Sequence, residues 1–153
     1  MSSLELKVPP VLQVLIIAFA MYGLTGIFTS LQVTVFGTNW LASSLAIVGI
    51  ALAIMGVLAF KKAQTTVNPH TPEKSENLVT TGIYHYTRNP MYLGMLLVIL
   101  GWAFYLSNVA ALLVLPIFII YMSRFQIQPE ERVMMQNFGD EYQAYMIKVR
   151  RWL

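Results

Sequence analysis

The chain has 153 residues, of which 57% are hydrophobic and 11% charged, with a formal net charge of +3. Soluble domains usually carry about 25% charged residues. Here two long runs, residues 8–60 and 89–123, contain no Asp, Glu, Lys, Arg or His. A soluble protein of this size could not cover such runs, so we expect an integral membrane protein. The absence of cysteine excludes a disulfide framework, a thiolate zinc site and a cysteine nucleophile.

The first predicted span covers residues 11–30, and twenty helical residues at about 1.5 Å each match a hydrocarbon layer of about 30 Å. Residues 37–39 form an uncharged turn, and the second span covers residues 40–60, ending at Lys61 and Lys62. Gly49 and Gly56 lie on this second span. Small residues at such positions favour close packing of a neighbouring helix.

A polar loop rich in proline and charge follows at residues 61–90. The next apolar run is broken at Ser107 and Asn108, so it predicts a short helical hairpin with arms at residues 91–106 and 109–122. Each arm has about 16 residues or fewer, which is short for a membrane crossing of about 20. We expect Pro116 to kink the second arm.

The C-terminal region, residues 124–153, predicts amphipathic helices. Pro129 suits a helix start, and Glu130 and Glu131 would then face the positive end of the helix dipole. Phe138 and Gly139 should interrupt this helix.

All Lys and Arg residues fall before the first span, between the second and third, or after the fourth. The positive-inside rule therefore places both termini and the loop at residues 61–90 on the cytoplasmic side of a plasma or inner membrane. The expected fold is a single all-α membrane domain over residues 1–153, with four transmembrane helices and cytosolic C-terminal helices. The basic residues form no dense aromatic-interleaved patch, so no nucleic-acid partner is expected, and the residue pattern suggests no metal site.

The polar residues gather in two segments on either side of the hairpin. Residues 78–92 read L-V-T-T-G-I-Y-H-Y-T-R-N-P-M-Y, and the second segment contains E-E at 130–131 and F-G-D-E-Y at 138–142. No ionisable residue lies within a predicted span, which argues against a proton-coupled transporter. A site between the two segments would be open to both water and lipid.

In this order and spacing, the two segments resemble the isoprenylcysteine carboxyl methyltransferase family and its phospholipid methyltransferase relatives. The resemblance implies S-adenosyl-L-methionine as cofactor and a lipophilic small molecule or lipid as substrate, in contact with membrane lipids. It also implies a set of cofactor-binding residues: Asn77, Leu78, Val79, Tyr84, Asn89, Pro90, Met91, Tyr92 and Glu130. The substrate-side or catalytic candidates are Arg88, Arg124 and Gln126.

The chain departs from the carboxyl methyltransferases at three of these positions. Asn77 and Asn89 stand where those enzymes have His, and Gln126 stands where they use an Arg for the substrate carboxylate. The acceptor therefore stays open between a prenylcysteine-like acid and an amine lipid, as does the choice of O-, N- or S-methylation. The alternative functions are a non-catalytic four-helix scaffold and a small transporter, and the oligomeric state is open.

Simpler explanations exist for single residues. Glu130 would suit the dipole of a free helix N-terminus. Tyr84 and Tyr92 would suit an interfacial aromatic belt, and Arg88 would suit a positive-inside anchor.

Overall fold

A computed structural model describes residues 5–34, 36–63 and 77–153. The described part of the chain is helical and contains no strand. Its main helices are α1 (Pro10–Ile27), α2 (Thr38–Lys62), α3 (Pro90–Leu106), α4 (Val109–Leu112), α5 (Leu115–Met122) and α6 (Gln128–Lys148). Short 3-10 turns occur at η1 (Thr29–Leu31) and η3 (Gly82–His85), and a π-helical segment, η4, covers Ser123–Ile127. The predicted loop at residues 61–90 includes residues 64–76, which lie outside the described residues.

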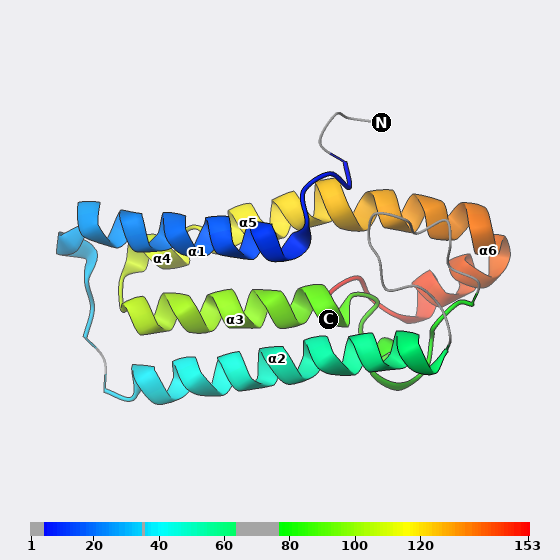
Figure 1. Cartoon of the computed structure of the whole chain (residues 1–153), viewed down its shortest axis with the longest axis horizontal. Coiled ribbons are helices and arrows are strands. Elements are labelled where there is room, and N and C mark those ends of the chain that lie inside the picture. The colour runs from blue at the N-terminus through cyan, green and yellow to red at the C-terminus, as the bar shows by residue number, and fades with distance from the viewer. Residues whose placement is uncertain (1–4, 35, 64–76) are drawn as a thin grey trace.

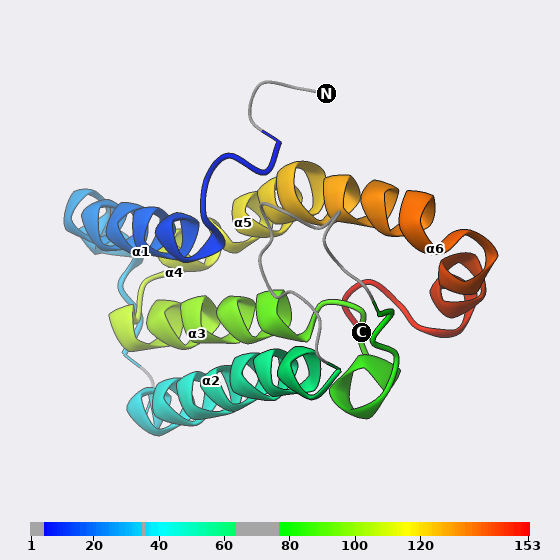
Figure 2. The ribbon, with the colours of Figure 1, turned by 45° about the vertical axis from the view of Figure 1, so that its right-hand side comes forward.

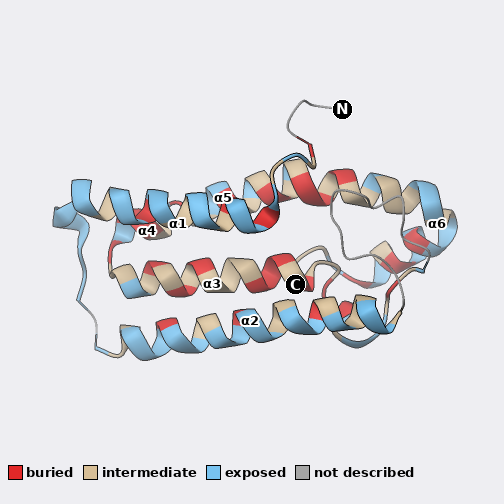
Figure 3. Cartoon of the chain, viewed as in Figure 1, coloured by how far each residue is buried: buried red, intermediate tan, exposed pale blue. Residues whose placement is uncertain are grey.

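Helix α3 is the centre of the bundle. It lies between α1 and α2 in two views (Figures 1 and 2) and contacts α1, α2, α4 and α5. Its buried residues include Tyr92, Ile99 and Ala103, whereas α1 and α2 are largely exposed (Figure 3). The exposed side chains of these two outer helices are mostly apolar, for example Phe19 and Ile47. Such a surface requires lipid as its solvent, so this is an integral membrane protein.

Helix α2 packs on α3 along a seam of small residues. A Cβ atom built on Gly94 would lie 2.4 Å from the Gly49 carbonyl oxygen, and one on Gly101 would lie 2.7 Å from the Ala42 oxygen. A Cβ on Gly56 would lie 2.7 Å from Cγ of Met91. Seven-residue spacing keeps these positions on one helix face. The predicted close approach at Gly49 and Gly56 is therefore confirmed.

Three helical stretches contain an apolar window long enough to cross a membrane: α1, α2 and Val109–Lys148, whose charged residues all lie from Arg124 onward. Helix α3 has 17 residues, or about 26 Å at 1.5 Å per residue. The chain breaks after α3 as predicted, at Ser107, which adopts a left-handed conformation with φ 51°. The Asn108 side chain then caps α4 by accepting a hydrogen bond from Ala110 N at 2.9 Å.

The second arm of the hairpin differs from the expected single kinked helix. It consists of α4 and α5, separated at residues 113–114, and Pro116 lies in the first turn of α5. Proline has no N–H and its ring clashes with the carbonyl four residues earlier, here that of Leu112. The helix therefore ends at that residue and begins again before the proline.

Pro129 lies in the first turn of α6 as predicted, followed by Glu130 and Glu131, but this helix start is not free. Helices α5 and α6 run on through the π-helical segment η4, and Ile127 has helical backbone angles. The proline ring would clash with the carbonyl of Phe125 in a regular α-helix. In the wider π turn this carbonyl instead accepts a hydrogen bond from Leu6 N, at 3.0 Å. The predicted dipole partnership of Glu130 with a free N-terminus is therefore wrong.

Within α6, Gly139 has φ 48° and ψ −123°, so the predicted interruption occurs at this residue. The chain reverses there and residues 140–153 return toward the start of α3 (Figures 1 and 2). The end of α2, the start of α3 and all of α6 lie toward one end of the bundle (Figure 1). The uncharged connections between α1 and α2 and between α3 and α4 lie at the other end.

Candidate active site

Three predicted cofactor residues from three elements meet at the charged end of the bundle. Tyr92 of α3 donates a hydrogen bond from its hydroxyl to Oε1 of Glu130 on α6, at 2.5 Å. Tyr84 of η3 is only 4% exposed, and its hydroxyl has no hydrogen-bond partner among the described residues. Its pKa is raised by burial and by the nearby Tyr145 and Glu130. We call Tyr84, Tyr92 and Glu130 the tyrosine–glutamate cluster.

The carboxyl group of Glu130 is held in a poorly solvated position. Burial raises the pKa of Glu130 to about 8, the hydrogen bond from Tyr92 acts in the opposite direction, and the charge of Glu131 raises the pKa further. Burial disfavours the charged form of a carboxyl group. A cationic ligand placed here would restore the carboxylate, so the site suits a positively charged group.

Aromatic packing fixes Tyr84 from two sides. The ring of Phe60, near the end of α2, meets the Tyr84 ring edge-on with centroids 5.3 Å apart. The hydroxyl of Tyr145 donates to the backbone carbonyl of Tyr84 at 2.6 Å. Tyr145 also packs with Tyr142 and Val149 in a small buried cluster. The returning half of α6 therefore supports the turn that carries Tyr84.

Residues 77–79 approach this same small cluster. Leu78 packs against it, and Val79 is buried. The Asn77 side chain is exposed and donates to the carbonyl of Ala63, just beyond α2, at 3.0 Å. The segment predicted to line the cofactor thus bridges the end of α2 and the second half of α6.

Asn89 and Arg88 are bound to the C-terminal residues. Asn89 Nδ2 donates to the carbonyl of Arg151 at 2.9 Å. Arg88 pairs with Glu131 at 2.7 Å through Nη2, and its Nη1 donates to the carbonyls of Met146 and Val149. The Arg88 side chain is only 10% exposed. Its role in the structure is therefore internal bonding rather than contact with the surface of the membrane.

The other predicted residues, Pro90, Met91, Arg124 and Gln126, have contacts outside the tyrosine–glutamate cluster. Pro90 and Met91 pack against Gly56 of α2. Arg124 lies 3.6 Å from the carboxylate of Glu5, and Gln126 is buried and donates from Nε2 to the carbonyl of Val8 at 2.6 Å.

Sequence reasoning did not count four residues that frame the site among the site residues: Glu131, Tyr142, Tyr145 and Arg151. The two tyrosines are three residues apart and share a helix face, which is a usable signal. The partners of Glu131 lie 43 and 20 residues away in the chain, and no local pattern indicates them.

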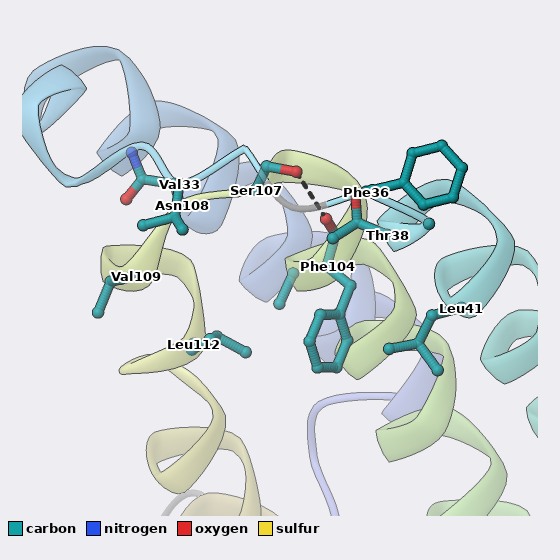
Figure 4. Close-up of a pocket in the computed structure, with 11 residues that line it drawn as sticks. Val33, Phe36, Thr38, Leu41, Phe104, Ser107, Asn108, Val109 and Leu112 are labelled. Carbon is teal, nitrogen blue, oxygen red and sulfur yellow. Dashed lines mark hydrogen bonds between the residues drawn. The ribbon is translucent and has the colours of Figure 1, made fainter.

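A separate apolar pocket lies at the opposite, uncharged end of the bundle. Its volume is about 290 Å³, and it lies between the start of α2, the end of α3 and α4 (Figure 4). Leu41, Phe104 and Leu112 line it, and the Ser107 hydroxyl at its rim donates to the Phe104 carbonyl. It is not part of the tyrosine–glutamate cluster.

Comparison with known proteins gives a family match that includes the cluster and two partial matches to individual proteins. A family model described as phospholipid methyltransferase matches residues 37–141. An uncharacterized protein of Haemophilus influenzae is 49% identical over 63 residues, which is 41% of this chain and all of that protein. A protein-S-isoprenylcysteine O-methyltransferase of Schizosaccharomyces pombe is 36% identical over 76 residues, covering 50% of this chain.

The match to the yeast protein spans only 32% of its length. No solved structure matches the chain. The family match covers more than half of the chain and includes Tyr84, Tyr92 and Glu130. The chain therefore belongs to the phospholipid methyltransferase family, and it is similar in part to an isoprenylcysteine methyltransferase.

Proposed function

We propose that this protein transfers a methyl group from S-adenosyl-L-methionine to a lipophilic acceptor at the cytoplasmic face of its membrane. The observation that carries the proposal is the tyrosine–glutamate cluster. It unites a desolvated carboxyl group with two buried tyrosines at the charged end of an otherwise apolar bundle. The family match supports methyl transfer as the reaction.

The residues present fit the charges of this cofactor. Its amino acid part carries an ammonium group, which the Glu130 carboxylate would pair with, and tyrosine faces attract cations such as a sulfonium. The hydroxyl of Tyr84, which has no bond within the described structure, is a donor available to a ligand.

The cofactor, when bound, supplies a methyl group on a sulfonium, which is already activated toward a nucleophile. The protein then has to orient the two reactants and exclude water, and it needs no strong base for an acceptor that is already deprotonated. Tyr84 and Tyr92 provide buried walls, and Phe60 closes the side toward α2. This requirement explains how a site without a Ser-His-Asp arrangement or a metal cluster among the described residues can be catalytic.

The arrangement leaves both a carboxylic acid and an amine lipid as candidate acceptors. A carboxylate acceptor needs an available guanidinium group. Arg88 and Arg151 are paired with Glu131, and Arg124 and Arg132 with Glu5, whereas the side chain of Arg150 is exposed. An amine headgroup would be attracted to the tyrosine rings, but its ammonium would first have to lose a proton, because only the free amine attacks the methyl group.

The direct test is binding of S-adenosyl-L-methionine to purified protein in nanodiscs, measured by titration calorimetry. Glu130→Gln should weaken binding by at least about tenfold, because a charge-assisted pair of about 1.5–3 kcal/mol is lost. Asp140→Asn, an exposed acid on the same helix, should bind like wild type. Wild-type protein that does not bind the cofactor would favour the scaffold alternative.

The acceptor is identified in a second step. Purified protein is incubated with methyl-labelled cofactor and a membrane lipid extract, and the labelled product is identified by mass. A labelled methyl ester would assign a carboxylic acid as the acceptor and a labelled amine lipid would assign an amine, whereas a cofactor-binding protein that labels no lipophilic product would overturn transfer to a lipophilic acceptor.

A further inference from the structure

We propose that Glu131 is a positioning residue for the cofactor site. It acts by holding the C-terminal segment, residues 149–153, against the turn at residues 87–89. This role rests on the proposed function, because the ligand it serves is the cofactor. It assigns a task to a carboxylate that does not itself belong to the tyrosine–glutamate cluster.

Glu131 binds two arginines at once. Its Oε1 accepts from Arg88 Nη2 at 2.7 Å and from Arg151 Nε at 3.1 Å, and its Oε2 accepts from Arg151 Nη2 at 2.6 Å. The pair with Arg151 is therefore bidentate, which fixes direction as well as distance. The Glu131 side chain is 14% exposed, so solvent screening of these pairs is limited.

The two arginines bring the C-terminal segment to the predicted cofactor residues. Arg88 N donates to the carbonyl of Arg150 at 3.0 Å. The Arg151 carbonyl accepts from Asn89 Nδ2 at 2.9 Å and from Thr87 Oγ1 at 3.3 Å. The segment is anchored further by Trp152, whose Nε1 lies 3.3 Å from Ser123 Oγ. Asn89 thus binds the backbone carbonyl of Arg151, and the side chain of Arg151 is in turn bound by Glu131.

The position of Glu131 next to Glu130 gives these bonds a second effect. Consecutive residues of an α-helix point about 100° apart, because a turn contains 3.6 residues. Glu131 therefore faces the arginines while Glu130 faces Tyr92. Fixing Glu131 sets the rotation of α6 about its axis, and with it the direction of the Glu130 carboxyl group.

The reversal at Gly139 makes this arrangement possible. Its backbone angles, φ 48° and ψ −123°, turn the second half of α6 back toward the start of α3, as Figures 1 and 2 show. The C-terminal segment consequently lies between the returning helix and residues 87–89. Because the C-terminal segment is bonded to both parts, it is a component of the site.

The test is a double-mutant cycle on cofactor affinity. Glu131→Gln, Arg151→Gln and the double variant are titrated with S-adenosyl-L-methionine in nanodiscs, and the thermal midpoint of each is measured. We expect each single variant to weaken binding about tenfold and the double variant about tenfold as well, because both changes break the same connection. Arg151→Lys, which keeps the charge but loses the bidentate geometry, should show a smaller loss.

Glu5→Gln is the matched control, since it removes a carboxylate that also binds two arginines, Arg124 and Arg132. It should lower the thermal midpoint and leave cofactor affinity unchanged. If Glu131→Gln lowers only the thermal midpoint, or if the two losses of affinity multiply to about a hundredfold, Glu131 is not a positioning residue. Wild-type protein without measurable binding would instead refute the proposed function itself.

Discussion

The packing of α2 on α3 allows a quantitative prediction for Gly94→Ala. The added Cβ would lie 2.4 Å from the carbonyl oxygen of Gly49 and 2.9 Å from the backbone nitrogen of Ala53. Ordinary contacts between carbon and a carbonyl oxygen are about 3.3–3.6 Å, so the two helices must separate locally by about 1 Å. Neither contact atom is the flexible end of a side chain, so neither can move alone.

Overpacking of this kind costs about 1–3 kcal/mol, and two backbone contacts place Gly94→Ala in the upper part of this range. The better helix propensity of alanine offsets about 1 kcal/mol. The net loss is then about 1–2 kcal/mol, or about 2–8 °C in the thermal midpoint at about 2–4 °C per kcal/mol. The assay is thermal unfolding in one detergent, followed by helical circular dichroism.

Gly23→Ala provides the control, because a Cβ on Gly23 of α1 meets no atom within 4 Å. This variant should keep or raise the thermal midpoint. If Gly94→Ala were as stable as Gly23→Ala, the close approach of α2 and α3 would be wrong.

Four further predictions follow from other parts of the molecule. Because the pKa of Glu130 is about 8 in the folded state and 4.5 ordinarily, the folded state holds a proton that the unfolded state lacks between these values. The thermal midpoint of the cofactor-free protein should therefore rise as pH falls from about 8.5 to 5.5, and less so in Glu130→Gln. Arg88→Lys keeps the charge opposite Glu131 but cannot reproduce bonds to two carbonyls and a carboxylate, and it should cost about 1–3 kcal/mol because buried acceptors lose their donor; an unchanged denaturation midpoint would contradict this. Ser107→Gly should stabilise the protein by up to about 1 kcal/mol, because φ is 51° there and glycine adopts this conformation without strain; a thermal midpoint below that of wild type would contradict this. In this cysteine-free chain, a membrane-impermeant thiol reagent applied to intact cells should label Thr38→Cys but not Lys148→Cys, and the reverse pattern would invert the proposed topology.

The helical spans and their close packing could be predicted from sequence because their signals are local. Uninterrupted apolar runs indicate lipid-facing helices, and small residues such as Gly49 and Gly56 indicate close approach. The breaks at Ser107 and Gly139 could also be predicted from sequence, because each follows from the short-range conformational preferences of the residues there.

Within the site, the motif resemblance indicated Tyr84, Tyr92 and Glu130, which the fold brings together. It could not indicate the bonds that support them. The Glu131 pairs and the bond to the carbonyl of Arg151 join residues far apart in sequence. The identity of a residue does not indicate which donor its backbone carbonyl binds.

The continuity of the last helix was missed for a similar reason. Pro129 ordinarily signals a helix boundary. Here a π turn accommodates it, and the bond that the proline cannot provide comes from Leu6, more than a hundred residues earlier.

This last contact imposes an order on how the protein assembles. The carbonyl of Phe125 cannot bond to the residue four positions later, because that residue is Pro129, and it accepts a hydrogen bond from Leu6 N instead. A buried backbone group without a partner is costly, so the segment around residue 125 gains its full stability only when the N-terminal segment has reached it. Docking of residues 5–8 should therefore be a late step of assembly. It should follow the pairing of α2 with α3, which are consecutive long helices in the chain.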